Sequence, residues 1–224
     1  MSGSTVIILN VRSGCRNKIE AAREIRSLIA KSGADCDLVV ARGGFRVIEA
    51  ARRMSKSSYQ TIVAAGGDGT INAVASELIG TDKRLGVLPL GTFNYFARDL
   101  GLPLDLEEAF QSCMDNHTAS IAVGEVNGRI FLNNASIGLY PMILSHREQT
   151  YRRFGRSRIA AYWSVLRVLL RLRLNMKLTI TANGESRRFQ TPMVFVARNA
   201  YQLEEFQAPG TESVRAFPGT LRAY

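Results

Sequence analysis

Cysteine and histidine are scarce in this sequence, and it has no long hydrophobic run. The 224 residues include three cysteines and two histidines, with no Cys-x-x-Cys pair, which argues against a disulfide framework or a structural zinc site. No stretch approaches the roughly 18 uncharged apolar residues that a membrane-spanning helix needs, and the apolar residues 6–9 are too few for a secretory signal. We therefore expect a cytoplasmic protein of one large or two small globular domains.

Acidic residues are also scarce relative to basic ones, and the imbalance is distributed unevenly along the sequence. The sequence holds 29 Lys and Arg against 19 Asp and Glu, and residues 119–224 contain 15 of these basic residues but only 6 of the acidic ones. Nine of the basic residues lie between positions 147 and 177, where Glu148 is the single acid. This surplus favours an anionic partner. Nucleic acid is the weaker candidate because no recognised binding motif accompanies the charge, so we expect an anionic membrane surface.

Apolar strands and amphipathic helices alternate through the first half of the sequence. This alternation is typical of a parallel sheet with helices on its faces. We predict strands over residues 5–11, 37–41, 61–65 and 85–88, and helices over residues 18–31, 46–54, 71–79 and 105–114.

After residue 116 the pattern changes to short strands and turn residues. Asn-Gly pairs at residues 127–128 and 183–184 lie between alternating apolar runs, and such pairs are strong hairpin signals. We predict strands over residues 119–126, 129–137, 177–182, 187–190 and 193–197. The predicted fold class is α/β, with a parallel-sheet domain over residues 1–118 followed by a β-rich, sandwich-like domain over residues 119–224.

One basic amphipathic helix, predicted over residues 157–172, interrupts the second half. Its apolar arc is wider than a helix packed on one side needs. Shallow membrane insertion would explain this width, with Arg158, Arg167 and Arg171 pairing with lipid phosphates and Trp163 at the interface. The alternative is a helix packed against the second domain, with its arginines solvated.

A glycine-rich loop, residues 66–70 (GGDGT), joins a predicted strand to a predicted helix. Glycines let phosphates approach the backbone, the N–H groups and dipole of a helix N-terminus attract anions, and Thr70 can cap the helix or donate a hydroxyl. Asp68 would repel a bare phosphate, so it indicates a bound cation or a proton-handling role. The loop is neither a P-loop nor a GxGxxG fingerprint, and the helix after it disfavours a simple hairpin turn.

Two more loops follow predicted strands in the same way. Residues 89–94 (PLGTFN) follow the fourth strand, and residues 10–14 (NVRSG) follow the first. The carboxyl ends of parallel strands meet at one edge of a sheet, and open α/β sheets bind ligands in a crevice at that edge. We therefore expect the three loops to line one crevice.

Three segments together resemble a known family: residues 66–72 (GGDGTIN), 88–101 (LPLGTFNYFARDLG) and 133–141 (NNASIGLYP). They are similar to the diacylglycerol kinase catalytic domain of the bacterial lipid kinase and sphingosine kinase superfamily. The resemblance covers roughly residues 5–140. It implies an ATP-binding α/β domain followed by a β-rich domain, with ATP and Mg²⁺ between them.

The resemblance also implies roles for individual residues. Asp68 is the acidic residue that we assign to catalysis and to the metal, and the general base stays unidentified. The implied ATP-binding residues are Asn10, Ser13, Gly14, Gly66, Gly67, Asp68, Gly69, Thr70, Ile71, Asn72, Gly91 and Thr92.

The sequence departs from the family pattern at several positions. Val11 replaces a usual proline, Ala73 stands where many members have Glu, and Tyr95 stands where many have Asp. Residues 215–221 match the stretch that normally carries the presumed catalytic Asp, and they contain no carboxylate. The family's chain also normally continues for several tens of residues and returns to the first domain, so we expect either a fragment or a protein that has lost its base.

These patterns predict an ATP-dependent lipid kinase, a transferase of phospholipid metabolism that phosphorylates a hydroxyl of a diacylglycerol-like lipid. We expect it to be peripherally associated with the inner face of the membrane. Two alternatives stay open: a soluble small-molecule kinase, because NAD kinases share a GGDGT loop, and a nucleotide-binding, membrane-associated protein without turnover. The identity of the lipid and the oligomeric state, a dimer included, stay open as well.

Overall fold

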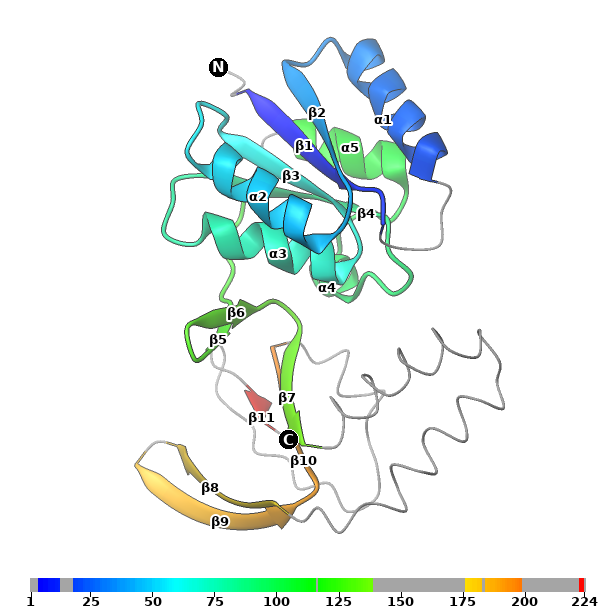
Figure 1. The fold of residues 1–224 in the computed structure, drawn as a ribbon. Helices are drawn as coiled ribbons and strands as arrows, with labels where there is room; N and C mark the ends of the chain where they lie inside the picture. Colours follow the sequence, from blue (N-terminus) through cyan, green and yellow to red (C-terminus); the bar gives the residue numbers. More distant parts are fainter. Residues whose placement is uncertain are drawn as a thin grey trace, which may run out of the picture. The chain divides into compact units, whose positions relative to one another are not determined.

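The computed structural model describes residues 4–12, 18–115, 117–138, 176–182, 184–198 and 222–223. The chain divides into two compact units, Met1–Asn133 and Asn134–Tyr224 (Figure 1). The sequence pattern places the domain change earlier, near residue 118. The difference arises because the hairpin that follows this position is still attached to the first unit, through side chains described below.

A four-stranded parallel sheet forms the centre of the first unit. Its strand order is β2-β1-β3-β4, and the registers pair Ile7 with both Leu38 and Val63. Strands β1 and β3 are buried along their whole length, as expected for parallel strands that are covered on both faces. The strands are β1 (Thr5–Asn10), β2 (Cys36–Ala41), β3 (Thr61–Gly66) and β4 (Arg84–Pro89).

Helices cover both faces of this sheet (Figure 1). Alternate side chains of β1 enter the two layers: Ile7 and Leu9 pack with α1 (Lys18–Ser32) and α5 (Leu106–Met114), whereas Val6 and Ile8 pack in the opposite layer. That opposite layer is formed by the helices α2 (Gly44–Ser55), α3 (Asp68–Leu78) and α4 (Tyr95–Asp99). The first unit is therefore a three-layer α/β domain, as the alternating pattern predicts.

Two details of the first unit differ from the predicted elements. Helix α4 has five residues and was not predicted. Helix α3 begins at Asp68 rather than at residue 71, so the last three residues of the GGDGT loop form the first turn of the helix. The carboxylate and the third glycine of the loop therefore lie on a helix end rather than in a flexible connector.

A short hairpin follows at the end of the first unit. Strands β5 (Gly124–Val126) and β6 (Arg129–Phe131) are antiparallel, and Asn127 and Gly128 between them both have positive φ, as the hairpin signal predicts. The predicted strand 119–126 forms only over β5. The predicted strand 129–137 is divided at residues 132–133, because side chains of the first unit hold these two residues.

The second unit is β-rich in its described residues. Strand β7 (Asn134–Gly138) pairs antiparallel with β10 (Met193–Ala197), which pairs with β11 (Arg222–Ala223). Strands β8 (Met176–Ala182) and β9 (Glu185–Thr191) form an antiparallel hairpin. A parallel α/β unit followed by antiparallel strands confirms the predicted fold class.

The predicted basic helix, with Arg158, Trp163, Arg167 and Arg171, lies outside the described residues. Among the residues that are described, no helix is long and apolar enough to cross a membrane.

Candidate functional site

The loops that the sequence singled out meet at the carboxyl edge of the parallel sheet. All four strands are parallel, and in the order β2-β1-β3-β4 the chain adds β2 on one side of β1 and β3 on the other. Open α/β sheets bind ligands at such a switch point. Asn10 ends β1 and Gly66 ends β3, so both lie at this point. The loop after β4 is attached to the same place, since Leu90 N–H donates to the Gly66 carbonyl at 2.9 Å.

The side chain of Asn10 connects the segments that follow β1, β2 and β3. Its Nδ2 donates to Thr70 Oγ1 at 2.9 Å, and its Oδ1 accepts from the N–H groups of Arg12 and Gly43. Asn10 and Thr70 are both buried. The side chain of Asn10, predicted to bind ATP, is therefore engaged in joining these segments.

Gly67 and Gly91 bring two loops into direct backbone contact. A Cβ added to Gly91 would lie 2.6 Å from the Cα of Gly67, and one added to Gly67 would lie 3.2 Å from the Cα of Gly91. A Cβ on Gly66 would likewise meet the Thr70 side chain at 2.6 Å. Gly66 and Gly91 are therefore required by packing, and Gly67 leaves little room for a side chain.

Gly69 is different, because a Cβ there would meet nothing within 4 Å. It occupies the first turn of α3, where no side chain caps the helix at Gly67. A glycine inside a helix costs about 1 kcal/mol relative to alanine, and packing does not explain this one. The open space beside uncapped N–H groups suits an anion such as a phosphate.

Asp68 is held in a fixed orientation beside this helix end. Its Oδ1 accepts from the backbone N–H of Phe96 at 2.9 Å and from Asn133 Nδ2 at 3.0 Å. The first donor lies in α4 and the second lies directly before the second unit. Both hydrogen bonds are to Oδ1, so Oδ2 keeps its capacity to accept from a donor or to bind a cation.

Asn72 has a structural contact that the sequence did not indicate. Its Oδ1 accepts from Leu132 N–H at 3.0 Å, and its Nδ2 donates to the Ile130 carbonyl at 3.4 Å. One amide thus holds the backbone of residues 130–132 against α3. This attachment explains why the first unit extends to Asn133.

The loop after β4 is shaped by Asn94. This residue has the left-handed conformation, with φ of 53°, and is buried. Its side chain donates to the carbonyls of Pro89 and Gly91 and accepts from Gly91 N–H. Thr92 and Phe93 are exposed beside it, and the Phe93 ring stacks on Tyr95 with centroids 5.3 Å apart.

The described residues thus bring together most of the predicted ATP-binding set. Asn10, Gly91, Thr92 and residues 66–72 lie at the carboxyl edge of the sheet, whereas Ser13 and Gly14 lie outside the described residues. Sequence reasoning assigned no role to Asn94 or Asn133. Their only sequence signal is their place in the two segments that carry the family resemblance.

A bound nucleotide with Mg²⁺ fits these residues. No group of three or more His, Cys, Asp or Glu side chains within the described ranges could hold a metal alone. Magnesium, however, commonly binds through one or two carboxylates together with substrate phosphates. One oriented carboxylate beside an uncapped helix end meets this requirement.

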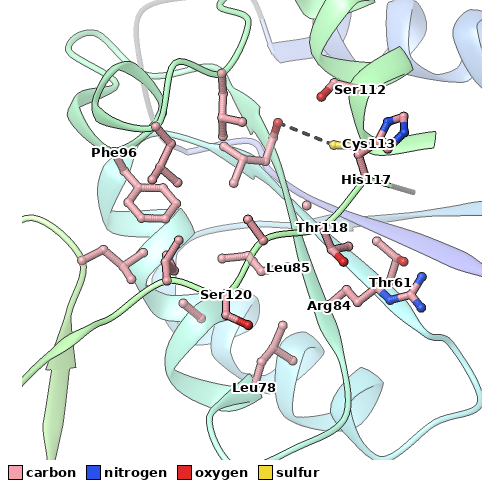
Figure 2. A pocket seen from close by; sticks show the side chains of 18 of the residues that line it. Thr61, Leu78, Arg84, Leu85, Phe96, Ser112, Cys113, His117, Thr118 and Ser120 are labelled. Carbon is pink, nitrogen blue, oxygen red and sulfur yellow. Dashed lines mark hydrogen bonds between the residues drawn. The ribbon is translucent and has the colours of Figure 1, made fainter. Parts of the chain in front are cut away.

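A cavity of the first unit lies elsewhere. It has a volume of about 580 Å³ and lies along β4, between α5 and the extended residues 117–123 (Figure 2). Phe96 and Leu85 contribute to an apolar lining that also contains Cys113, and none of the glycine loops contributes to it. The Cys113 thiol donates to the Val87 carbonyl, and burial raises its pKa to about 11. We do not place the phosphate chemistry in this cavity.

The fold and the candidate site together define an open α/β domain with glycine loops at its switch point. The chain belongs to the diacylglycerol kinase catalytic domain family, whose sequence profile matches residues 4–126. This match confirms the family that the sequence motifs indicate.

Curated relatives include diacylglycerol kinases of staphylococci. The chain is 41% identical over 99 residues to that of Staphylococcus haemolyticus, covering 43% of this chain and 30% of the relative. It is 33% identical over 135 residues to that of Staphylococcus carnosus, covering 59% of this chain and 44% of the relative. The matched regions therefore span less than half the length of these relatives.

A solved structure shares the fold. The crystal structure of a diacylglycerol kinase from Bacillus anthracis superimposes with a TM-score of 0.65 at 21% identity, covering 89% of this chain and 65% of the other. This similarity extends beyond the first unit, so it supports the order of a parallel α/β unit followed by β-rich structure.

Proposed function

We propose that this protein is an ATP-dependent lipid kinase that transfers a phosphoryl group to the hydroxyl of a diacylglycerol-like lipid. One observation carries the proposal: α3 begins without a side-chain cap, at a glycine with open space around it, beside an oriented carboxylate. Membership of the diacylglycerol kinase catalytic domain family supports the reaction class.

The roles of the residues follow from their positions. The N–H groups of Asp68 and Gly69, together with the dipole of α3, bind the phosphates of ATP. The contact between Gly67 and Gly91 keeps the two loops close enough to enclose them. Asp68 presents Oδ2 to a magnesium ion, which would neutralise charge that develops on the transferred group. Catalysis here consists of positioning and electrostatic stabilisation.

The lipid acceptor is proposed on two grounds. The relatives described above carry the name diacylglycerol kinase, and the net charge of +10 favours an anionic surface. We accordingly propose a cytoplasmic protein bound peripherally to the inner membrane face, with Arg158, Trp163, Arg167 and Arg171 as lipid contacts. The base that accepts the hydroxyl proton is not assigned, because Asp68 is engaged with Phe96 and Asn133.

A second candidate is a nucleotide-binding, membrane-associated protein without turnover. It is favoured by Tyr95, which stands where many family members have Asp, and by the lack of a carboxylate in residues 215–221. In this case the cradle binds ATP while the hydroxyl stays protonated. Loss of a positioned general base typically slows such a reaction by about 10²- to 10⁴-fold.

The test measures binding and transfer side by side on the same preparation. Calorimetry with Mg²⁺ and ATP reports occupancy of the cradle, and transfer of labelled γ-phosphate to diacylglycerol in mixed micelles reports turnover. Binding with transfer supports the kinase, and binding without transfer supports the second candidate. If neither ATP binding nor transfer is measurable, both are wrong.

A further inference from the structure

Asn133 makes an unusual contact with Asp68. It is the last residue of the first unit, and its Nδ2 lies 3.0 Å from Asp68 Oδ1. The two residues are far apart in the sequence, and one belongs to the first turn of α3. No other part of Asn133 takes part in the site described above.

The chemistry of the carboxylate fixes the orientation of this amide. An ionised carboxylate only accepts hydrogen bonds, so Asn133 must present its amino group to Asp68. Its Oδ1 therefore points away, and this atom is buried with no partner among the described residues. A buried acceptor without a donor costs free energy. An apolar side chain would avoid that cost, but it would leave Asp68 Oδ1 with one donor instead of two.

The two donors of Asp68 Oδ1 come from different parts of the fold. The Phe96 N–H belongs to α4, which follows β4, and Asn133 follows the hairpin of β5 and β6. One donor alone would leave the carboxylate free to rotate about its χ angles. Two donors converging on one oxygen leave a single orientation, with Oδ2 as the free acceptor.

We infer that Asn133 is a positioning residue that fixes Asp68 so that Oδ2 meets the metal bound to the nucleotide. This inference rests on the proposed function. Groups that orient a metal-binding side chain in this way typically contribute about 10- to 100-fold to metal affinity. Asn133 contacts Asp68, so its effect on the metal would pass through that carboxylate.

A purely structural role is the rival explanation, because Asn133 lies where the first unit ends. Asn72 already holds the backbone of the same segment through Leu132 and Ile130. If Asn133 served only to strengthen this attachment, its loss would lower stability without a specific effect on metal-dependent binding. The two roles therefore differ in a measurable way.

The test is a double-mutant cycle on the full chain. Mg²⁺-dependent ATP affinity and melting temperature are measured for the parent, Asn133→Ala, Asp68→Asn and the double variant. We expect Asn133→Ala to weaken Mg²⁺-dependent ATP binding by about tenfold or more. In the Asp68→Asn background the same change should have little further effect, because the carboxylate that it positions is already gone.

Two further variants serve as controls. Asn133→Leu removes the amide but keeps a similar volume, so it tests the hydrogen bond if the alanine variant folds poorly. Thr81→Ala removes a side-chain hydrogen bond to Leu78 at the other end of α3, and it should lower the melting temperature while ATP affinity stays unchanged.

Each result tests the positioning role of Asn133. If the parent binds Mg²⁺ and ATP but both Asn133 variants bind equally well, the positioning role is wrong and the proposed function stands. If the effects of Asn133→Ala and Asp68→Asn add, Asn133 does not act through Asp68. If the parent does not bind at all, the proposed function fails, and the inference fails with it.

Discussion

Helices α3 and α5 belong to the same unit but begin in opposite ways. Helix α5 is capped by Asp105, whose Oδ1 accepts from the N–H groups of Glu107 at 2.9 Å and Glu108 at 3.2 Å. Helix α3 begins at Asp68, and its N-cap residue, Gly67, provides no side-chain cap. It carries a carboxylate in its first turn, but Asp68 turns away to Phe96 and Asn133.

Under the proposed function, the difference separates a helix that only stabilises the fold from one that also presents a binding site. An uncapped helix end forgoes roughly 1 kcal/mol that a cap would supply. Helices α2 and α4 also begin without a side-chain cap, so the missing cap points to a ligand at α3 only together with the open space at Gly69 and the oriented Asp68. Exceptions to local rules such as helix capping are expected at functional or strained sites.

Among the variants that test the difference between α3 and α5, Gly91→Val should have the largest effect on stability and ATP binding. The new Cβ would lie 2.6 Å from the Gly67 Cα, at the start of α3. Backbone atoms cannot yield as a flexible side chain would, so we expect a loss of about 3 kcal/mol in the free energy of unfolding, together with loss of ATP binding. Urea denaturation and calorimetry measure the two quantities. An unchanged urea midpoint would mean that the two loops are not in contact.

Gly69→Ala should affect stability and binding in opposite directions. The added methyl meets no protein atom, so we expect the unfolding free energy to rise by about 0.5–1 kcal/mol. The same methyl occupies the space where phosphate would approach, and we expect ATP affinity to fall about tenfold. Gly67→Val is a poorer test, because its Cβ also meets the Gly91 backbone. Unchanged ATP affinity in a stabilised Gly69→Ala protein would place the phosphates elsewhere.

Asp105→Ala should affect stability alone. Removing the cap leaves the N–H groups of Glu107 and Glu108 without their acceptor, which typically costs about 1 kcal/mol. We expect unchanged ATP affinity, because α5 lies on the opposite face of the sheet from α3. Thermal unfolding and calorimetry on one preparation test both expectations. A drop in affinity as large as that of Gly69→Ala would remove the distinction between the two helices.

Near neutral pH, the smallest effect concerns Cys113, close to the end of α5. Burial raises its pKa from 9.0 to about 11, so the folded protein holds the thiol proton more tightly than the unfolded chain does. The resulting stabilisation is complete below pH 9 and is lost as the pH rises towards 11. We expect Cys113→Ala to lose less stability than the parent between pH 8 and pH 10.5, as measured by urea midpoints. Equal losses of stability would mean that the thiol has the same pKa in the folded and the unfolded protein.

The order and type of most elements in the first unit could be predicted from the sequence. Central strands such as β3 are continuous apolar runs, and α1 and α2 have a clear helical period. Helix α4 could not be predicted, because it has only five residues and starts after the left-handed Asn94. Its first turn depends on Asp68, which accepts from Phe96 N–H and lies 28 positions away in the sequence.

Only part of the candidate site could be predicted, because only some of its residues have a local sequence signal. Glycine loops at strand ends have a local signature, so residues 66–70 and Gly91 could be recognised. The roles of Asn72 and Asn133 depend on partners about 60 positions away, and a single sequence does not show which residues meet across such a distance. The predictions that concern the basic helix stay untested by the described residues.

The position of β4 at the end of the sheet has a consequence for the behaviour of the protein in solution. Arg84 and Leu90 direct their N–H groups to β3, so the backbone groups of Leu85 and Val87 point to the outer side of the sheet. Cys113 donates to the Val87 carbonyl, and α5 and residues 117–123 lie along β4 as well. A strand edge that loses such cover is a template for pairing with other chains. We therefore expect self-association to appear only when this cover is loosened, and a charged residue at Leu85 to oppose it at some cost in core packing.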